Sequence, residues 1–115
     1  DGNLLNGESL QSAADMARGL GAEVILVSAG RIPMIEKSLP HIINGLPSGA
    51  KAIVGRYSPP SWKPDFYPRF ENTDEVSPET YAEQAKGWLD QGILIIGGSS
   101  GTTPEHIRAL RKIIN

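Results

Sequence analysis

The chain has 115 residues and a formal net charge of −2, the balance of 11 Lys and Arg against 13 Asp and Glu. This length fits a single domain, residues 1–115, and the charge provides no basic field to attract nucleic acid or an anionic membrane. The sequence has no long apolar run and no cysteine, so we expect no membrane span, no disulfide and no thiolate metal site.

The first predicted helix covers residues 9–20. Its apolar residues recur at helical spacing, Ser9 suits the N-cap position, and Gly21 follows as a stop. The apolar stripe consists of Leu10, Ala13, Ala14, Ala17 and Leu20. A short β-branched run then predicts a strand over residues 23–30, buried on both faces as in a parallel sheet. Because the chain begins with Asp1 rather than Met, we also expect a trimmed leader before it.

The next two predicted elements are a helix over residues 32–45 and a strand over residues 50–57. Pro33 suits the first helical position, and an inner apolar stripe follows it. Pro40 lies inside the pattern, where proline removes a backbone donor, so a kinked helix and a break at this residue both fit the sequence. The strand has the same buried, parallel-sheet composition as the first one.

Residues 58–76 predict a long structured loop. Its prolines exclude a regular helix or a central strand, and its aromatic residues argue against disorder. The aromatic residues are Trp62, Phe66, Tyr67 and Phe70, and the carboxylates around them are Asp65, Glu71, Asp74 and Glu75. The aromatic side chains fit a ligand lid, a dimer contact or packing that pins the loop to the domain, whereas the carboxylates are typical of a solvated loop.

The last part of the chain predicts a helix, a strand and a second helix. Residues 77–92 begin with Ser77 as N-cap and end at Gly92, residues 93–98 form the strand, and residues 103–114 form the last helix. Helices and strands therefore alternate along the chain, which indicates right-handed βαβ units. The predicted fold class is α/β, with three parallel strands and four helices.

The stretch between the third strand and the last helix carries a specific motif. Residues 97–107 read GGSSGTTPEHI and closely resemble the C-terminal hallmark of the homocysteine S-methyltransferase family, Gly-Gly-Cys-Cys-Gly-Thr-Thr-Pro-Glu-His-Ile. Everything matches except the two cysteines. The similarity covers most of the chain and is weakest between about residues 55 and 65. The resemblance implies the C-terminal part of that family's TIM barrel, which is shared by betaine–homocysteine methyltransferase and the homocysteine domain of methionine synthase.

The resemblance also implies a zinc site whose ligands this sequence lacks. In the family, three cysteines bind one zinc ion, which lowers the pKa of the homocysteine thiol so that its thiolate attacks a methyl donor. The corresponding positions are Ala29, Ser99 and Ser100, and none of them is a thiol. Serine hydroxyls bind zinc feebly and alanine does not bind it, so we expect no metal and no cofactor. The joint loss of all three thiols resembles deliberate removal.

We therefore interpret the chain as an engineered, cysteine-free barrel fragment, built for autonomous folding, with no catalytic residues and no native activity. A complete barrel takes about 250 residues, so this piece has free sheet edges and an uncovered former lumen face. The first helix could swing across that face to give a flavodoxin-like α/β/α sandwich, which we favour. Copies could instead self-associate through the sheet edges or the open face. The parent family implies a cytoplasmic protein, and an engineered chain would be recombinant.

Two other functions fit the same residues. The first is a zinc-dependent homocysteine S-methyltransferase, or part of one, with mutated ligands. The second is an anion- or phosphate-binding module that uses backbone N–H groups at a helix N-terminus. Its loop residues would be Gly98, Ser99, Ser100, Gly101 and Thr102. A serine nucleophile with His106 as base is disfavoured, because we expect His106 at the surface or in a helix cap.

Overall fold

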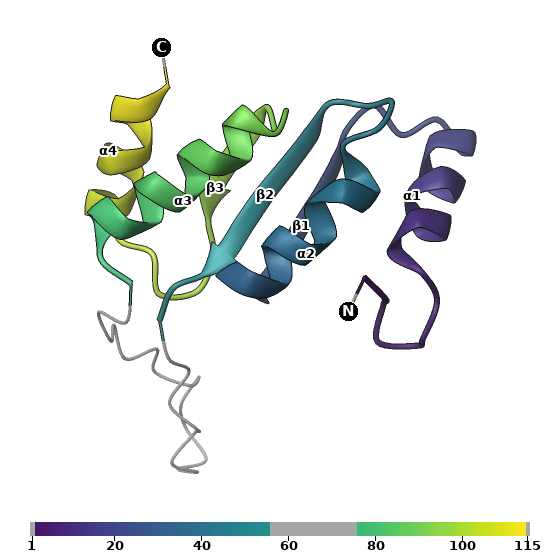
Figure 1. The fold of residues 1–115 in the computed structure, drawn as a ribbon, viewed down its shortest axis with the longest axis horizontal. Coiled ribbons are helices and arrows are strands. Elements are labelled where there is room, and N and C mark those ends of the chain that lie inside the picture. Colours follow the sequence, from purple (N-terminus) through teal and green to yellow (C-terminus); the bar gives the residue numbers. More distant parts are fainter. Residues whose placement is uncertain (1, 56–75, 115) are drawn as a thin grey trace, which may run out of the picture.

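The computed structural model describes residues 2–55 and 76–114, which form an open α/β fold (Figure 1). Its elements in chain order are α1 (Leu10–Gly19), β1 (Ile25–Arg31), α2 (Ile32–Ile42), β2 (Ser48–Ile53), α3 (Pro78–Asp90), β3 (Ile95–Gly98) and α4 (Pro104–Ile113). The predicted fold class is confirmed within these ranges. The predicted loop over residues 58–76, with its aromatic residues and carboxylates, lies outside the described residues except for Val76.

The sheet has the strand order β1-β2-β3, with both neighbouring pairs parallel. In one register row Leu26 of β1 faces Gly49 of β2, which in turn faces Ile95 of β3. The β1–β2 register shifts between Val27 and Gly30, so β1 carries an irregularity close to its carboxyl end. The described strands form an open sheet that does not close into a barrel.

The helices form one layer on one face of the sheet (Figure 1). Helix α2 contacts β1 and β2, α3 contacts α4, and α4 contacts β3. Helix α1 lies beside α2 at the end of this layer, where its buried Ala14 and half-buried Leu10 reach the core. The α/β/α sandwich that we favoured is therefore not formed, because α1 uses its apolar side against α2 and does not cross the opposite face.

The described residues do not cover the face of the sheet opposite the helices. Leu26 and Ile95 remain 46% and 39% exposed there, although both are strand residues. Gly49 lies between them, and a Cβ on Gly49 would be 2.8 Å from Leu26 Cγ and 3.0 Å from Ile95 Cβ. The side chains of the two outer strands thus approach each other over a glycine of the central strand.

The hydrophobic core lies between the sheet and the helical layer. Its largest fully buried side chains are Trp88, Tyr81, Leu39, Ile42, Ile93 and Val54. Full burial of one large aliphatic side chain contributes about 1.5–3 kcal/mol, so these contacts account for much of the packing energy. The rings of Tyr81 and Trp88 pack edge to face, with centroids 5.8 Å apart. The buried side chains of the central strand are all small and belong to Ser48, Ala50 and Ala52.

The predicted helix ends are confirmed by their capping bonds. Ser9 Oγ accepts from the N–H of Ser12 at 3.0 Å, and Ser77 Oγ accepts from the N–H of Thr80 at 3.1 Å. Each cap satisfies a backbone donor that has no partner within the helix, which is worth about 1 kcal/mol. The predicted stop Gly92 has φ of +106°, a conformation that glycine adopts without steric cost.

Helix α2 continues through Pro40 and ends at Ile42, so the alternative of a break at this residue is wrong. Because Pro40 is close to the carboxyl end, it disturbs only the last turn. The helix is three residues shorter than the predicted range 32–45, and β2 begins two residues earlier than the predicted strand. Within the described ranges, the helices are too short or too polar to traverse a lipid bilayer.

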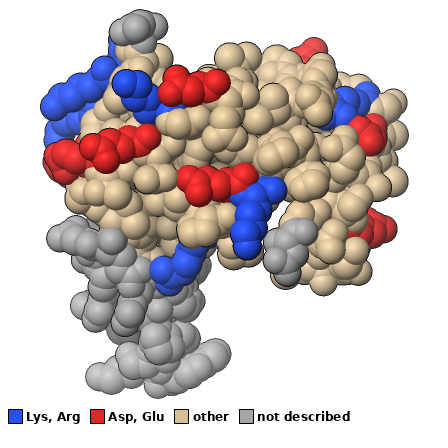
Figure 2. Space-filling model, viewed as in Figure 1, with Lys and Arg blue, Asp and Glu red and all other residues tan. Residues whose placement is uncertain are grey.

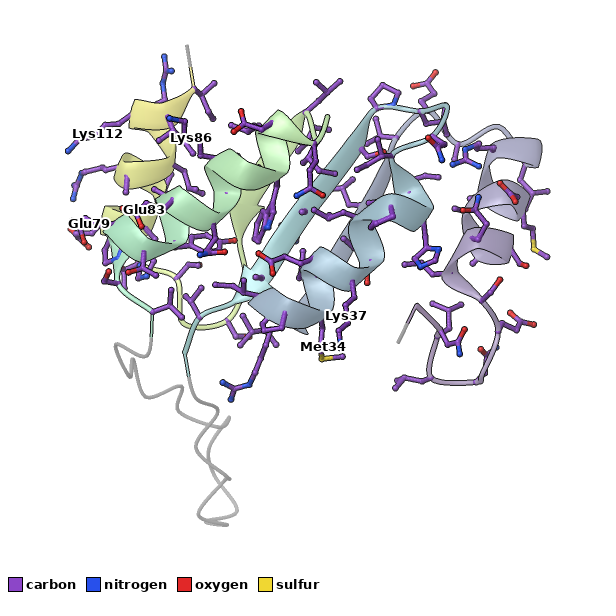
Figure 3. The ribbon with its side chains drawn as sticks, in the orientation of Figure 1. Met34, Lys37, Glu79, Glu83, Lys86 and Lys112 are labelled. Carbon is purple, nitrogen blue, oxygen red and sulfur yellow. The ribbon has the colours of Figure 1, made fainter. Side chains whose placement is uncertain are left out.

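Charged side chains are distributed over the helical layer. On the face seen in Figure 2, acidic and basic residues are interspersed and form no large patch of one sign. Figure 3 shows Glu83 and Lys86 of α3 and Lys112 of α4 pointing to the outside of the layer, and all three are exposed. These charged groups are therefore solvated at the outer surface, and they do not point at the strand ends.

Candidate functional site

The candidate site lies at the carboxyl ends of the strands. In open parallel α/β sheets, ligands bind at this edge, where the loops after neighbouring strands come together. The three positions that the resemblance predicts to correspond to zinc ligands belong to this edge. Ala29 is in β1, within the irregular part of its register, and Ser99 and Ser100 follow β3 directly. Figure 1 shows the loop between β3 and α4 passing the carboxyl end of β2.

The turn over residues 97–102 is held by several hydrogen bonds. The N–H of Val54, just after β2, donates to the carbonyl of Ser100 at 3.0 Å. Thr102 donates to the carbonyl of Ser99 twice, from Oγ1 at 2.6 Å and from its backbone nitrogen at 3.1 Å. The turn therefore has one bond to the neighbouring strand and two internal bonds that fix its curvature.

A close backbone approach adds to these bonds. Gly101 has φ of +84°, in the left-handed region, and a Cβ at this position would overlap the backbone nitrogen and Cα of Gly55. Only glycine combines this conformation with this approach. The glycine of the Gly-Ser loop is thus needed for packing against the end of β2.

Tyr81 of α3 connects the two strands next to the turn. Its buried hydroxyl accepts from the N–H of Ala52 at 3.1 Å and donates to the carbonyl of Gly97 at 2.6 Å. Burial raises the pKa of Tyr81 above its ordinary value, and the hydrogen bond from Ala52 partly offsets this rise in pKa. The phenol is therefore held in its neutral form, which can both accept and donate.

His106 is buried in the first turn of α4 and caps it. Its Nδ1 accepts from the backbone N–H of Thr103 at 3.1 Å and lies 2.9 Å from Thr103 Oγ1, while its Nε2 lies 2.8 Å from the carbonyl of Val76. A backbone N–H can only donate and a carbonyl can only accept, so these partners assign the neutral tautomer with hydrogen on Nε2. Of the two positions that we expected, the surface and a helix cap, the structure shows the cap, and neither ring nitrogen is directed at Ser99 or Ser100.

The donors near the start of α4 are largely used within the chain. The N–H of Thr102 bonds to Ser99, the N–H of Thr103 bonds to His106, and Pro104 has no N–H. The backbone N–H of Glu105 bonds to its own carboxylate and, with a weaker contribution from Thr103, lowers the pKa of that carboxyl group. An anion at the predicted loop would compete with these bonds, and anion binding there stays a prediction.

The donor set at the strand ends does not fit a zinc ion. Ala29 offers no ligand atom, and the other two positions offer neutral hydroxyls where catalytic zinc takes Cys, His or carboxylate ligands. Within residues 2–55 and 76–114, no three His, Asp or Glu side chains are grouped so that they could hold a metal. The residues that this chain supplies therefore cannot reproduce a three-thiolate centre.

The family follows from the sequence as a whole. A model of the family described as homocysteine S-methyltransferase matches residues 1–114. The chain belongs to the homocysteine S-methyltransferase family. Our expectation of a protein that is not an enzyme is wrong, because this match places the chain in a family of methyltransferases. We had inferred the loss of catalysis from the loss of one set of metal ligands. The ligand positions alone are not sufficient evidence that the protein is not an enzyme.

Two features of the candidate site were missed by the sequence reasoning. The sequence reasoning gave neither Tyr81 nor Gly55 a role at this edge of the sheet. The bond from Tyr81 to Ala52 joins residues 29 positions apart, so no local periodicity predicts it. The glycine itself was the available signal at position 55, since a glycine that follows a buried strand indicates a close backbone approach.

Proposed function

We propose that this chain is the C-terminal part of a homocysteine S-methyltransferase barrel, and that the carboxyl ends of its strands form the thiol-acceptor side of the methyl-transfer site. The family match over residues 1–114 supports this proposal most directly. The rigid turn beside the end of β2 also supports it, because a fixed turn at this edge suits a site that must hold two adjacent side chains.

The chemistry requires the acceptor sulfur to lose its proton before it takes the methyl group. Zinc supplies this activation where three thiolates hold it, and this chain does not supply them. Ser99 and Ser100 offer hydroxyl groups, which can form hydrogen bonds but coordinate zinc only feebly. In this proposal, the chain retains the frame of the acceptor site with its ligands replaced.

Restoring the three thiols tests whether that frame is intact. The variant Ala29→Cys/Ser99→Cys/Ser100→Cys is purified under reducing conditions, and bound zinc is measured by elemental analysis. We expect about one zinc per chain, with cobalt substitution giving the absorption bands of tetrahedral thiolate coordination. Homocysteine should then change the cobalt spectrum by entering the open position.

A matched control carries three cysteines away from the strand ends. Ser12 of α1, Ser38 of α2 and Gln91 just after α3 are suitable, because their cysteine variants keep the same thiol count without the same grouping. We expect no stoichiometric zinc in this control or in the unmodified chain. If the variant with restored cysteines binds no more zinc than the control, the strand ends are not the acceptor frame.

An engineered origin is a further proposal, supported by the pattern of the replacements. The motif GGSSGTTPEHI keeps its other residues while both of its cysteine positions carry serine, which is close to cysteine in size. If the thiols were removed from an intact site, restoring them should leave stability nearly unchanged. The urea midpoint of the variant with restored cysteines should then stay close to that of the unmodified chain, and a large fall would contradict this origin.

A further inference from the structure

A buried tyrosine joins β2 to β3 immediately before the Ser99–Ser100 turn. Tyr81 is fully buried, and its hydroxyl bonds to Ala52 on one strand and to Gly97 on the other. In the register of the sheet, Ala52 faces Gly98, so these two bonds lie at the last described pairing of β2 with β3. The hydroxyl therefore fixes the point at which β3 leaves the sheet.

A second bond to β2 lies just beyond this point. The N–H of Val54 holds the carbonyl of Ser100 at 3.0 Å. Between Gly97 and Ser100, the chain is therefore tied to the end of β2 at both ends, first through the phenol and then directly. Ser99 lies between these two attachments, so its backbone has little freedom to move.

The end of the turn is connected to the segment just before α3, which is the helix that contains Tyr81. His106 connects the N–H of Thr103 to the carbonyl of Val76, two residues before α3 begins. The rings of Tyr81 and His106 pack edge to face, with centroids 6.1 Å apart. Tyr81 thus fixes the entry of the turn, and the neighbouring His106 fixes its exit.

We propose that Tyr81 is a positioning residue whose hydroxyl determines where the Ser99 and Ser100 side chains stand. The significance of this role rests on the proposed function, which makes these two positions the acceptor side of the site. A residue needed only for core packing would act through its ring, whereas positioning depends on the two hydrogen bonds of the hydroxyl. The variant Tyr81→Phe separates these roles, because it keeps the ring and removes both bonds.

Amide hydrogen exchange in the 115-residue chain gives the first test. In Tyr81→Phe, we expect the amide of Ala52 to exchange at least about tenfold faster than in the parent, with smaller increases at Val54 and Thr102. The amide of Ala50, in the same strand but without a bond to the phenol, should change only by the factor common to the whole domain.

The matched control is Trp88→Phe. Trp88 is a buried neighbour of Tyr81, and its Nε1 finds no hydrogen-bond partner among the described residues. This variant should weaken the core without releasing the turn. It should therefore raise the exchange rates of the slowly exchanging amides by one common factor. If Tyr81→Phe produces the same uniform pattern, Tyr81 is a packing residue and the positioning role is refuted.

Zinc affinity in the variant with restored cysteines gives the second test. Loss of a residue that orients ligands typically lowers metal affinity by about 10–100-fold. We expect such a loss when Tyr81→Phe is added and little change when Trp88→Phe is added. Unchanged affinity with Tyr81→Phe would refute positioning of these side chains. If the restored cysteines bind no zinc at all, the proposed function fails, and the exchange experiment still decides whether Tyr81 orders the turn.

Discussion

Replacing Gly101 with alanine tests how tightly the turn is fixed. A side chain in the left-handed conformation of Gly101 costs about 1–2 kcal/mol. The new Cβ would also overlap the backbone of Gly55, so one of the two segments must move. That movement breaks the bond between Val54 and Ser100, which contributes about 0.5–1.5 kcal/mol. We therefore expect Gly101→Ala to lower the free energy of unfolding by about 1.5–3.5 kcal/mol.

Urea denaturation followed by circular dichroism measures this change, with two other glycines as controls. A Cβ at Gly97 would make only ordinary contact, 3.5 Å from Lys51, so Gly97→Ala should cost less than about 1 kcal/mol. At Gly87, within α3, a Cβ would meet nothing within 4 Å, and alanine should stabilise the helix by about 0.5–1 kcal/mol. If Gly101→Ala costs no more than Gly97→Ala, the inferred contact with Gly55 does not constrain the turn.

Three further predictions concern the caps, the buried phenol and the open face. Ser77→Ala should lower the free energy of unfolding by about 1 kcal/mol because it removes the N-cap of α3, whereas Ser38→Ala within α2 should be nearly neutral in the same urea experiment. Because the pKa of Tyr81 is raised on folding, its stabilising contribution is complete below the unfolded pKa of about 10 and is lost as the pH rises through the folded value. Urea midpoints measured above about pH 10 should therefore fall in the parent more than in Tyr81→Phe, and equal slopes would contradict this reasoning. We also propose that copies associate through the open face, so light scattering should show that Leu26→Lys shifts the chain toward monomer while Met34→Lys, 60% exposed on the helical side, does not. A parent that is already monomeric would exclude this association.

The helix ends were predictable because their signals are local. Ser9 and Ser77 each bond to a backbone N–H three residues ahead, so the residue type and its place before an apolar stripe suffice. Coverage of the apolar stripe was not predictable in the same way. Leu20 was assigned to the apolar stripe of the first helix, yet it lies just beyond α1 and is 83% exposed. Periodicity shows which side of a helix is apolar, but not whether another element covers that side.

The site was predictable only as far as its motif extends. The motif located the turn and the cap of α4, and His106 is found in that cap. The role of Tyr81 could not be predicted without knowing which strands are neighbours, since its two hydrogen-bond partners belong to β2 and β3. Function was misjudged because the loss of the zinc ligands was taken as the loss of enzyme function, although the chain as a whole matches a family of methyltransferases.

The glycine in the middle of the sheet has a consequence for how this sequence can change over time. Side chains from both outer strands rest above Gly49, so any larger residue there would push two neighbours aside at once. Ala50 and Ala52 face the opposite side, beneath the helices, and are completely enclosed. Natural drift and laboratory selection should therefore accumulate substitutions along the rims of the sheet and leave its centre small.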